Sequence, residues 1–233
     1  MGYEYRQWVL PEPASMHFLP ASTLLPDLVR DLERLGWLTS PLPPLRTRHP
    51  VGGKPESRRV GVDELGATVD DLLCGSGAVL VELPVIEGSA ESSSEVIGPG
   101  QCYAADLLLS RELCFVPSDG VQDGKLVCHG CGGDLSPALA APHLQSIWQS
   151  FWGAHTLHAA KCPVCHVPLP SEQVRHHVRN VAQHSKDQAP FFRFALRFDD
   201  GAPSADPAPL DPSLSVALEA RIGIRLRACG RWT

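Results

Sequence analysis

The spacing of apolar positions along the chain predicts alternating strands and amphipathic helices. Aromatic and β-branched residues favour a strand over Tyr3–Leu10. Leucines three or four residues apart then predict a helix that begins after Ser22 or Thr23 and stops at Gly36. A continuous apolar run predicts a buried strand over Ala78–Ile86. The N-terminal part of the chain therefore combines strands with at least one helix.

The same reasoning gives further elements toward the C-terminus. Asp63 is a candidate N-cap of a short second helix, and one or two strands are expected within Gln101–Val116. A strand is clear over Phe191–Phe198. A helix capped by Asp211 and stopped by Gly223 follows, and the chain ends on a half-exposed strand in which apolar residues alternate with arginines.

Other segments lack strand periodicity. Thr39–Arg59, Glu87–Gly100 and Asp199–Pro212 are rich in turn-forming or charged residues and predict loops. Between the second and third of these loops, apolar residues at helical spacing predict a helix over Pro142–Trp152. A further helix is expected from Ser171 onward, with valines on one face.

Two Cys-x-x-Cys pairs are the strongest chemical signal in the sequence. They join Cys128 with Cys131 and Cys162 with Cys165. Each pair presents two thiolates on a tight turn, and the two pairs together supply the four sulfurs of a closed tetrahedral zinc site. Such a site keeps no position open for water. The four cysteines are therefore predicted to be ligands of a structural Zn²⁺.

The segments around these pairs carry a resemblance to a known family. CHGCGG at Cys128–Gly133 and CPVCHVPL at Cys162–Leu169 resemble zinc ribbons and zinc knuckles. The resemblance implies a zinc-built fold but no particular activity, because zinc ribbons are attached to many unrelated functions. The pairs are farther apart than is typical of such sites, which implies an enlarged finger or two knuckles joined by a larger fold.

The elements together predict an α+β protein. Residues 1–124 and 191–233 are expected to form one domain, a mixed sheet with packed helices to which both chain ends contribute. Residues 125–190 are expected to form an inserted zinc-ribbon-like module with two helices.

Two other functions of the paired cysteines fit the sequence less well than zinc binding. A redox pair stands at a helix N-terminus, whereas the residues after Cys165 do not predict a helix. Cys162 to His166 fits the pattern of haem attachment, but the N-terminal residues lack the apolar run of an export signal. The other four cysteines lie in apolar stretches and are expected to be buried: Cys74, Cys102, Cys114 and Cys229.

Eight of the ten histidines lie between residues 129 and 184. His155 with His158, or His177 with His184, could hold a second metal ion with a bound water. The segment lacks the HExxH and deaminase motifs, and Glu172 is its only glutamate. We therefore expect these histidines to have structural or surface roles, with a metal-dependent hydrolase as the alternative.

Charge bears on the choice of partner. The net charge of −6 argues against general nucleic-acid binding, and no apolar run is long enough to span a membrane. Four arginines near the C-terminus form a cluster that either binds an acidic group or protects a strand edge: Arg221, Arg225, Arg227 and Arg231.

The sequence thus predicts a non-catalytic protein of the bacterial cytoplasm that binds another protein. Arginine makes up sixteen of the twenty basic residues, which is typical of GC-rich bacterial genomes. Long loops and the lack of a catalytic motif are compatible with an adaptor, or with an immunity or antitoxin-like protein. The alternatives are the hydrolase described above and a zinc-ribbon protein that binds nucleic acid.

Overall fold

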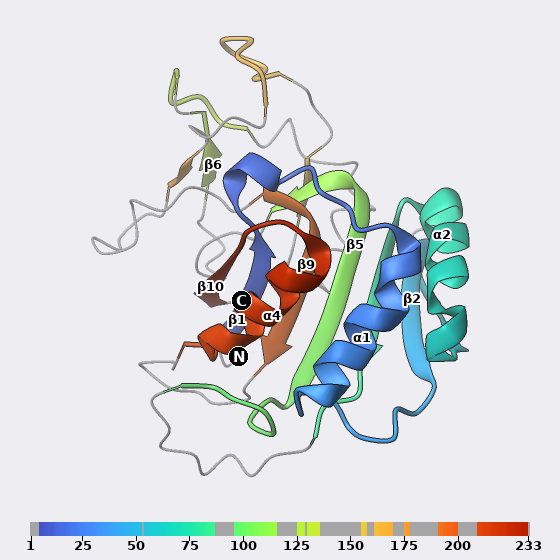
Figure 1. Cartoon of the computed structure of the whole chain (residues 1–233). Coiled ribbons are helices and arrows are strands. Elements are labelled where there is room, and N and C mark those ends of the chain that lie inside the picture. The colour runs from blue at the N-terminus through green and yellow to red at the C-terminus, as the bar shows by residue number, and fades with distance from the viewer. Residues whose placement is uncertain are drawn as a thin grey trace.

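The computed structural model describes residues 5–52, 54–86, 96–115, 125–128, 130–135, 155–157, 161–169, 175–177, 191–199 and 209–232. Within these residues, an eight-stranded sheet carries the helices α1, α2 and α4 on one face (Figure 1). The α+β class predicted from the sequence is therefore confirmed.

The described strands and α-helices follow one another in this order: β1 (Tyr5–Pro11), α1 (Leu25–Arg34), β2 (Leu45–Val51), β3 (Lys54–Val60), α2 (Leu65–Ser76), β4 (Ala78–Leu83), β5 (Ala104–Phe115), β6 (Lys125–Val127), β7 (His155–Leu157), β8 (Arg175–His177), β9 (Phe191–Asp199), α4 (Pro212–Ile222) and β10 (Leu226–Trp232). Short 3-10 turns are η1 (Pro13–Ser15), η2 (Ser22–Leu24) and η3 (Val62–Glu64). The main sheet has the order β10-β1-β9-β5-β4-β2-β3, with β7 also paired to β5, while β6 pairs with β8 separately.

The strand directions are more uniform than the mixed sheet that was expected. Every described strand pair is antiparallel, and the one parallel contact is an isolated bridge between Ile97 and Leu210. The reason is the routing of the helical connections. α2 leads from β3 to β4 across β2, and α4 leads from β9 to β10 across β1. None of the described helices therefore joins two neighbouring strands, whereas the helix of a βαβ unit commonly joins parallel neighbours.

The first and last strands of the sheet lie side by side. β1 stands between β10 and β9, and Trp8 is opposite Cys229 on one side and Arg197 on the other. The short strand β7, which lies between the two cysteine pairs in sequence, joins β5. The division into residues 1–124 with 191–233 and an inserted module 125–190 stays a prediction.

Three of the four leucines in the stripe predicted for α1 are buried, and the fourth, Leu35, is exposed at the C-terminal end of the helix. Leu25, Leu28 and Leu32 pack with apolar residues of α2 and α4 against the helix-covered face of the sheet. The opposite face holds a second apolar cluster that includes Trp8 and Phe192. Residues of central strands are therefore buried on both faces, which explains the continuous apolar pattern of β9.

Helix termini were predicted with mixed success. Asp211 caps α4 by accepting a hydrogen bond from the Ser213 amide at 2.8 Å, and Gly223 ends the helix in the left-handed region. Ser22 and Asp63 make no capping hydrogen bond, because each lies in a 3-10 turn that precedes its helix. The Ser22 hydroxyl instead donates to Asp70 of α2 at 2.5 Å.

The predicted loop over Thr39–Arg59 is wrong, because most of it forms the β2–β3 hairpin. Val51 pairs with Lys54, so the turn consists of two residues that are both glycine in the sequence. Gly-Gly is a favoured sequence for such a turn. The strands were missed because β3 is exposed from Lys54 to Arg59 and has no apolar alternation.

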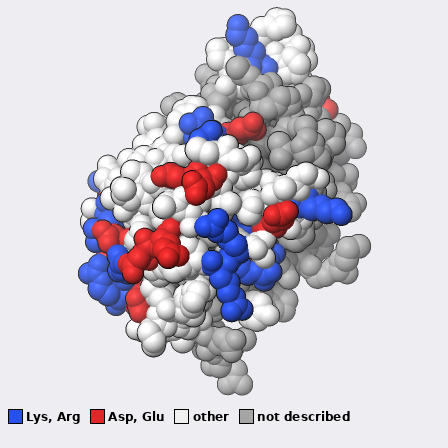
Figure 2. Space-filling model, turned by 90° about the vertical axis from the view of Figure 1, so that its right-hand side faces the viewer, with Lys and Arg blue, Asp and Glu red and all other residues white. Residues whose placement is uncertain are grey.

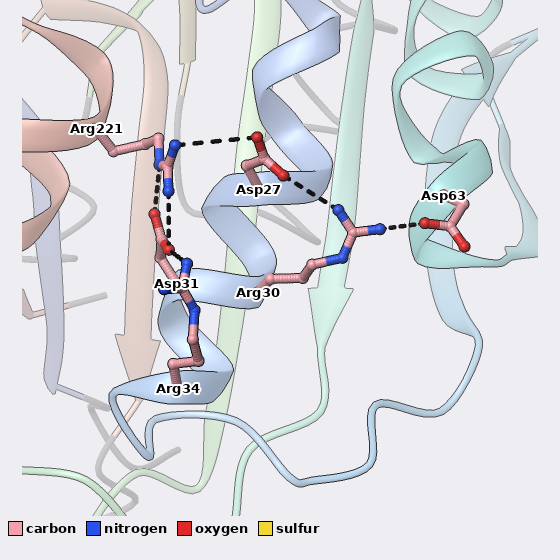
Figure 3. Close-up of polar contacts among 6 residues, drawn as sticks. All are labelled: Asp27, Arg30, Asp31, Arg34, Asp63 and Arg221. Carbon is pink, nitrogen blue, oxygen red and sulfur yellow. Dashed lines mark hydrogen bonds and ion pairs between the residues drawn. The ribbon is translucent and has the colours of Figure 1, made fainter.

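An ion-pair network ties the three helices together (Figure 3). Arg221 of α4 contacts Asp31 of α1 through two nitrogens, one of them at 3.1 Å. Arg30 of α1 bonds to Asp27 and to Asp63 in the turn before α2. The hydrogen bond from Arg221, with the charges of Arg221 and Arg34, lowers the pKa of Asp31 below its usual value.

The lowered pKa of Asp31 predicts a pH-dependent contribution to stability. A carboxyl group with a lowered pKa in the folded state stabilises the fold above its unfolded-state pKa, and this contribution disappears as the pH falls through the folded-state value. Asp31→Asn should therefore lower the free energy of unfolding at neutral pH, and the difference from wild type should shrink below about pH 4. Urea unfolding between pH 2.5 and 7 measures this difference. Asp63→Asn, at an exposed ion pair, is the control and should have little effect at any pH.

The contact between α2 and η2 predicts a second stability effect. A Cβ atom on Gly66 would lie 2.6 Å from the Ser22 carbonyl oxygen, so Gly66→Ala should separate the two elements and cost about 1–3 kcal/mol. Gly75 lies in the same helix with no atom within 4 Å of such a Cβ. Gly75→Ala should therefore be neutral or stabilise by up to about 1 kcal/mol. Equal effects of the two substitutions in chemical unfolding would contradict the packing argument.

Candidate metal centre

The four paired cysteines lie together in space. Their Sγ atoms are all within 4.8 Å of one another. The sulfurs of Cys128 and Cys165 are 3.6 Å apart, and those of Cys131 and Cys162 are 3.9 Å apart. A tetrahedral ion with bonds of about 2.3 Å would hold its ligand sulfurs about 3.8 Å apart. The cluster therefore fits a four-coordinate metal ion of that size, and the separations are too long for a disulfide.

The first cysteine pair lies on a turn closed by backbone hydrogen bonds. The Gly132 amide donates to the Cys128 carbonyl at 2.7 Å, and the Cys128 amide donates to the Gly133 carbonyl at 3.0 Å. The Gly133 amide also points at the Cys131 sulfur, 3.4 Å away. Gly132 has a φ of 68°, in the left-handed region that glycine adopts without strain.

The second cysteine pair repeats this turn. The His166 amide donates to the Cys162 carbonyl at 3.0 Å, and the Cys162 amide donates to the Val167 carbonyl at 2.8 Å. His166 takes the place of Gly132 with a φ of 62°, a conformation that is uncommon for a residue with a side chain. A β-bridge closes each turn, from Val127 to Asp134 and from Lys161 to Pro168. The two turns are thus equivalent residue by residue.

The paired turns enclose a small apolar core of their own. Leu135 and Leu169, which hold the same position after each turn, are both buried, as are Cys128 and Cys162. Two further members, Leu113 of β5 and Phe191 of β9, belong to the main sheet. Cys131 is exposed and Cys165 partly so. The centre therefore lies between solvent and the sheet, with two ligands on each side.

The four thiols influence one another's ionisation. The backbone amide of Cys165, with that of Val164, lowers the pKa of the Cys162 thiol to about 7. At Cys165 the backbone amide of Val167 favours the thiolate, but burial and the three neighbouring sulfurs outweigh it and raise the pKa to about 12. Because adjacent thiolates repel one another, the cluster ionises fully only when a cation binds it.

The predicted histidine site is only partly described. His155 lies in β7 and His177 in β8, and the side chains of both, with the whole of His158 and His184, lie outside the described residues. The helix expected from Ser171 is corrected, because Arg175–His177 is a strand paired with β6. His177 thus lies in a strand, and its pairing with His184 is untested because His184 lies outside the described residues. The helix expected over Pro142–Trp152 lies outside the described residues.

The other cysteines and the C-terminal arginines are distributed through the fold. Cys102 and Cys114 are buried as expected, and burial raises the pKa of Cys114 to about 12. Cys74 is exposed, contrary to expectation, because it lies on the outer face of α2, where its sulfur accepts a hydrogen bond from Arg111 at 2.9 Å. The side chain of Cys229 is not described.

Two of the four C-terminal arginines pair with carboxylates of the described fold. Arg221 belongs to the helix network, and Arg225 pairs with Glu219 at 3.0 Å. The hydrogen bond from the Leu226 amide, and that from Arg225, lower the pKa of Glu219. Arg227 is partly buried in β10, and the side chain of Arg231 is not described. Arg221 and Arg225 therefore have structural partners.

Sequence reasoning missed a charged row on the sheet face opposite the helices. Register places Glu82 of β4 beside Asp106 of β5, and Asp106 beside Arg197 of β9. The pair of Asp106 and Arg197 is buried, with the Arg197 Nε 3.0 Å from the carboxylate. These residues line a cavity of about 430 Å³ together with Arg48. Only strand register reveals the row, because its members are far apart in sequence.

Comparison of the chain with protein-family models, curated protein sequences and solved structures gave no match. The function of the chain must therefore be inferred from its own residues. Among the described residues, the four cysteines are the one group of three or more metal-ligating side chains close enough to share an ion. No helix in the described part of the chain is long and apolar enough to cross a membrane.

The close approach of the two turns predicts the effect of a single methyl group. A Cβ atom on Gly133 would lie 2.9 Å from Val164 Cγ2 and 3.1 Å from the Cys131 sulfur, whereas one on Gly130 would meet nothing closer than 3.7 Å. Gly133→Ala should therefore release bound metal to a chelator about ten times faster than wild type, and Gly130→Ala should not. Because Val164 is exposed, Val164→Ala should restore part of the slow release to Gly133→Ala. It removes the nearest atom, Cγ2, and leaves the Val164 Cβ at 3.2 Å and the Cys131 sulfur at 3.1 Å. Failure of this rescue would contradict the packing argument.

Proposed function

We propose that the chain is a non-catalytic protein that folds around one structural zinc ion and acts by binding another protein. The observation that carries the zinc assignment is the set of four sulfurs at tetrahedral spacing. Thiolates select soft or borderline ions such as Zn²⁺ or Cu⁺, or an iron–sulfur cluster. Paired turns with amides directed at sulfur match the closed zinc sites of zinc ribbons.

The geometry of the centre supports a structural role for the ion. Cysteine sulfur would occupy all four positions of a tetrahedral ion, so none remains for a water or a substrate. The Cys128 and Cys162 ligands are buried in the same apolar cluster as Leu113 and Phe191 of the main sheet. Binding energy at the centre would therefore act on folding. In small zinc peptides this energy is on the order of 10 kcal/mol.

Metal analysis tests the zinc assignment. Purified wild type should contain one equivalent of zinc by elemental analysis, and Cys128→Ser should lose it. Cys74→Ser is a matched control, because Cys74 is exposed and lies outside the sulfur cluster. This variant should keep its zinc. A wild-type protein that is folded and metal-free, or that holds iron in place of zinc, would contradict the assignment.

Binding of another protein is the function that these features favour. The structure offers a closed centre, and the carboxylates that line the charged cavity are each ion-paired with an arginine. Neither arrangement presents a free nucleophile or base. Thiolate ligation requires reduced cysteines, which supports a cytoplasmic location. An adaptor or an immunity or antitoxin-like protein of a bacterial cell would combine these properties.

Affinity capture from the cell of origin tests the binding function. The zinc-loaded chain should retain one protein in a stoichiometric complex that survives purification. The control is Cys128→Ser, which should retain less of it if the zinc centre organises the binding surface. A zinc-loaded chain that retains no protein but hydrolyses a substrate would favour the hydrolase alternative.

A further inference from the structure

The β2–β3 hairpin concentrates positive charge at one edge of the main sheet. Residues 45–60 contain five basic residues and one acidic residue, in a chain whose net charge is −6. Figure 2 views the molecule from the side on which β2 and α2 lie in Figure 1, and shows basic side chains gathered near the middle of this face with acidic ones on both sides. β3 is the terminal strand of the described sheet, and its residues from Lys54 to Arg59 are exposed.

Two arginines of the hairpin lie directly opposite each other. Arg46 of β2 is the register partner of Arg59 of β3. Both belong to the sheet face away from the helices, because the adjacent Arg58 reaches Thr68 of α2 on the helix side and the adjacent Val60 is buried in the helix-side core. Like charges in directly opposed positions destabilise a sheet. The stability of the hairpin therefore does not explain this pair.

The arginines on this face outnumber the carboxylates that they contact. Arg46 and Arg48 both reach Glu82, with Arg46 at 3.8 Å. Arg46 also donates to the hydroxyl of Ser57 at 3.3 Å. Arg59 forms no hydrogen bond or ion pair with the residues that the structure describes. Arg46 and Arg48 thus share the Glu82 carboxylate, and Arg59 adds a further positive charge at this edge.

Edge protection accounts for only part of this arrangement. Charged residues on a terminal strand discourage pairing with another chain, and Lys54 or Arg59 alone would have that effect. Arg46 and Arg48 belong to β2, which is paired on both sides and has no edge to protect. The basic residues on the open face of the hairpin are all arginine, whose planar fork binds carboxylates through two parallel hydrogen bonds.

We propose that Arg46, Arg48 and Arg59 form a docking surface for an extended acidic segment of a protein partner, which lies along the β3 edge. This inference rests on the proposed protein-binding function and names the surface involved. Carboxylates on alternate residues of an extended segment face the same side and would meet the arginine forks. Main-chain groups of β3 would be available to the same segment, since β3 pairs only with β2 among the described strands.

The neighbouring residues favour an acidic peptide over a nucleic acid. The basic residues of this surface lie on two strands, β2 and β3. The next register partners across the sheet are acidic, Glu82 on β4 and Asp106 on β5. Adjacent strands are about 4.8 Å apart, so this basic surface is as wide as one extended chain. A polynucleotide would need a broader basic surface to neutralise several phosphates.

A labelled peptide tests the surface. The probe is a decapeptide of alternating glutamate and threonine, and the reference probe has glutamine in place of glutamate. Fluorescence anisotropy at low salt should detect binding of the acidic peptide alone. Arg59→Glu should weaken this binding about ten-fold or more. The matched control is Lys54→Glu, which makes the same charge change on the same strand but on the other face. It should weaken binding less than about two-fold.

Three results would overturn the inference. The first is equal binding of the two peptides, and the second is an equal loss of affinity in Arg59→Glu and Lys54→Glu. The third is tighter binding, dependent on Arg59, of a thymidine hexanucleotide that carries the same number of negative charges, which would assign the surface to nucleic acid.

If Arg59→Glu still captures the partner found with wild type, the proposed protein-binding function stands and this docking surface is rejected. A chain that captures no partner and holds no zinc refutes the proposed function itself.

Discussion

The pairing of β9 with both β5 and β1 is the contact on which the rest of the structure depends. It joins the N-terminal strand to the strand that precedes the first cysteine pair, across most of the length of the chain. Phe192 of β9 packs against Trp8, and Phe198 packs against Trp37 on the helix side. Phe191, at the start of the same strand, belongs to the apolar cluster of the cysteine turns. One buried strand therefore positions the helix layer and the metal centre together.

Elements that bury a continuous or periodic apolar face could be predicted from the sequence. This applies to β4, β9 and α1. The residues that each of them buries form a continuous apolar run or a periodic apolar stripe in the sequence. The β2–β3 hairpin could not be read in this way, since one of its strands is exposed and both contain proline. Its only local signal is a Gly-Gly turn. The strand directions could not be predicted from the sequence either, because they depend on which strand each helix crosses.

The clustering of the four cysteines could be predicted from the sequence, but the equivalence of their two turns could not. The Cys-x-x-Cys spacing identifies four sulfurs regardless of fold. The equivalence of the two turns is hidden, because Gly132 in one corresponds to His166 in the other and Gly133 corresponds to Val167. Backbone hydrogen bonds define the turn, so side chains that avoid the sulfurs can vary. Gly133 cannot vary freely, because the second turn occupies the space beside it.

Charged residues form two different arrangements in this protein, which differ in how the arginines are paired. In the helix layer each arginine of the network has an aspartate partner, so charge fixes the helices against one another and leaves little excess. On the β2–β3 hairpin Arg46 and Arg48 share Glu82, and Arg46 lies opposite Arg59 in register. An excess of one sign costs stability, and this cost supports the proposal that the hairpin arginines bind a partner. Because the chain as a whole is acidic, attraction of an acidic partner would be confined to this sheet edge.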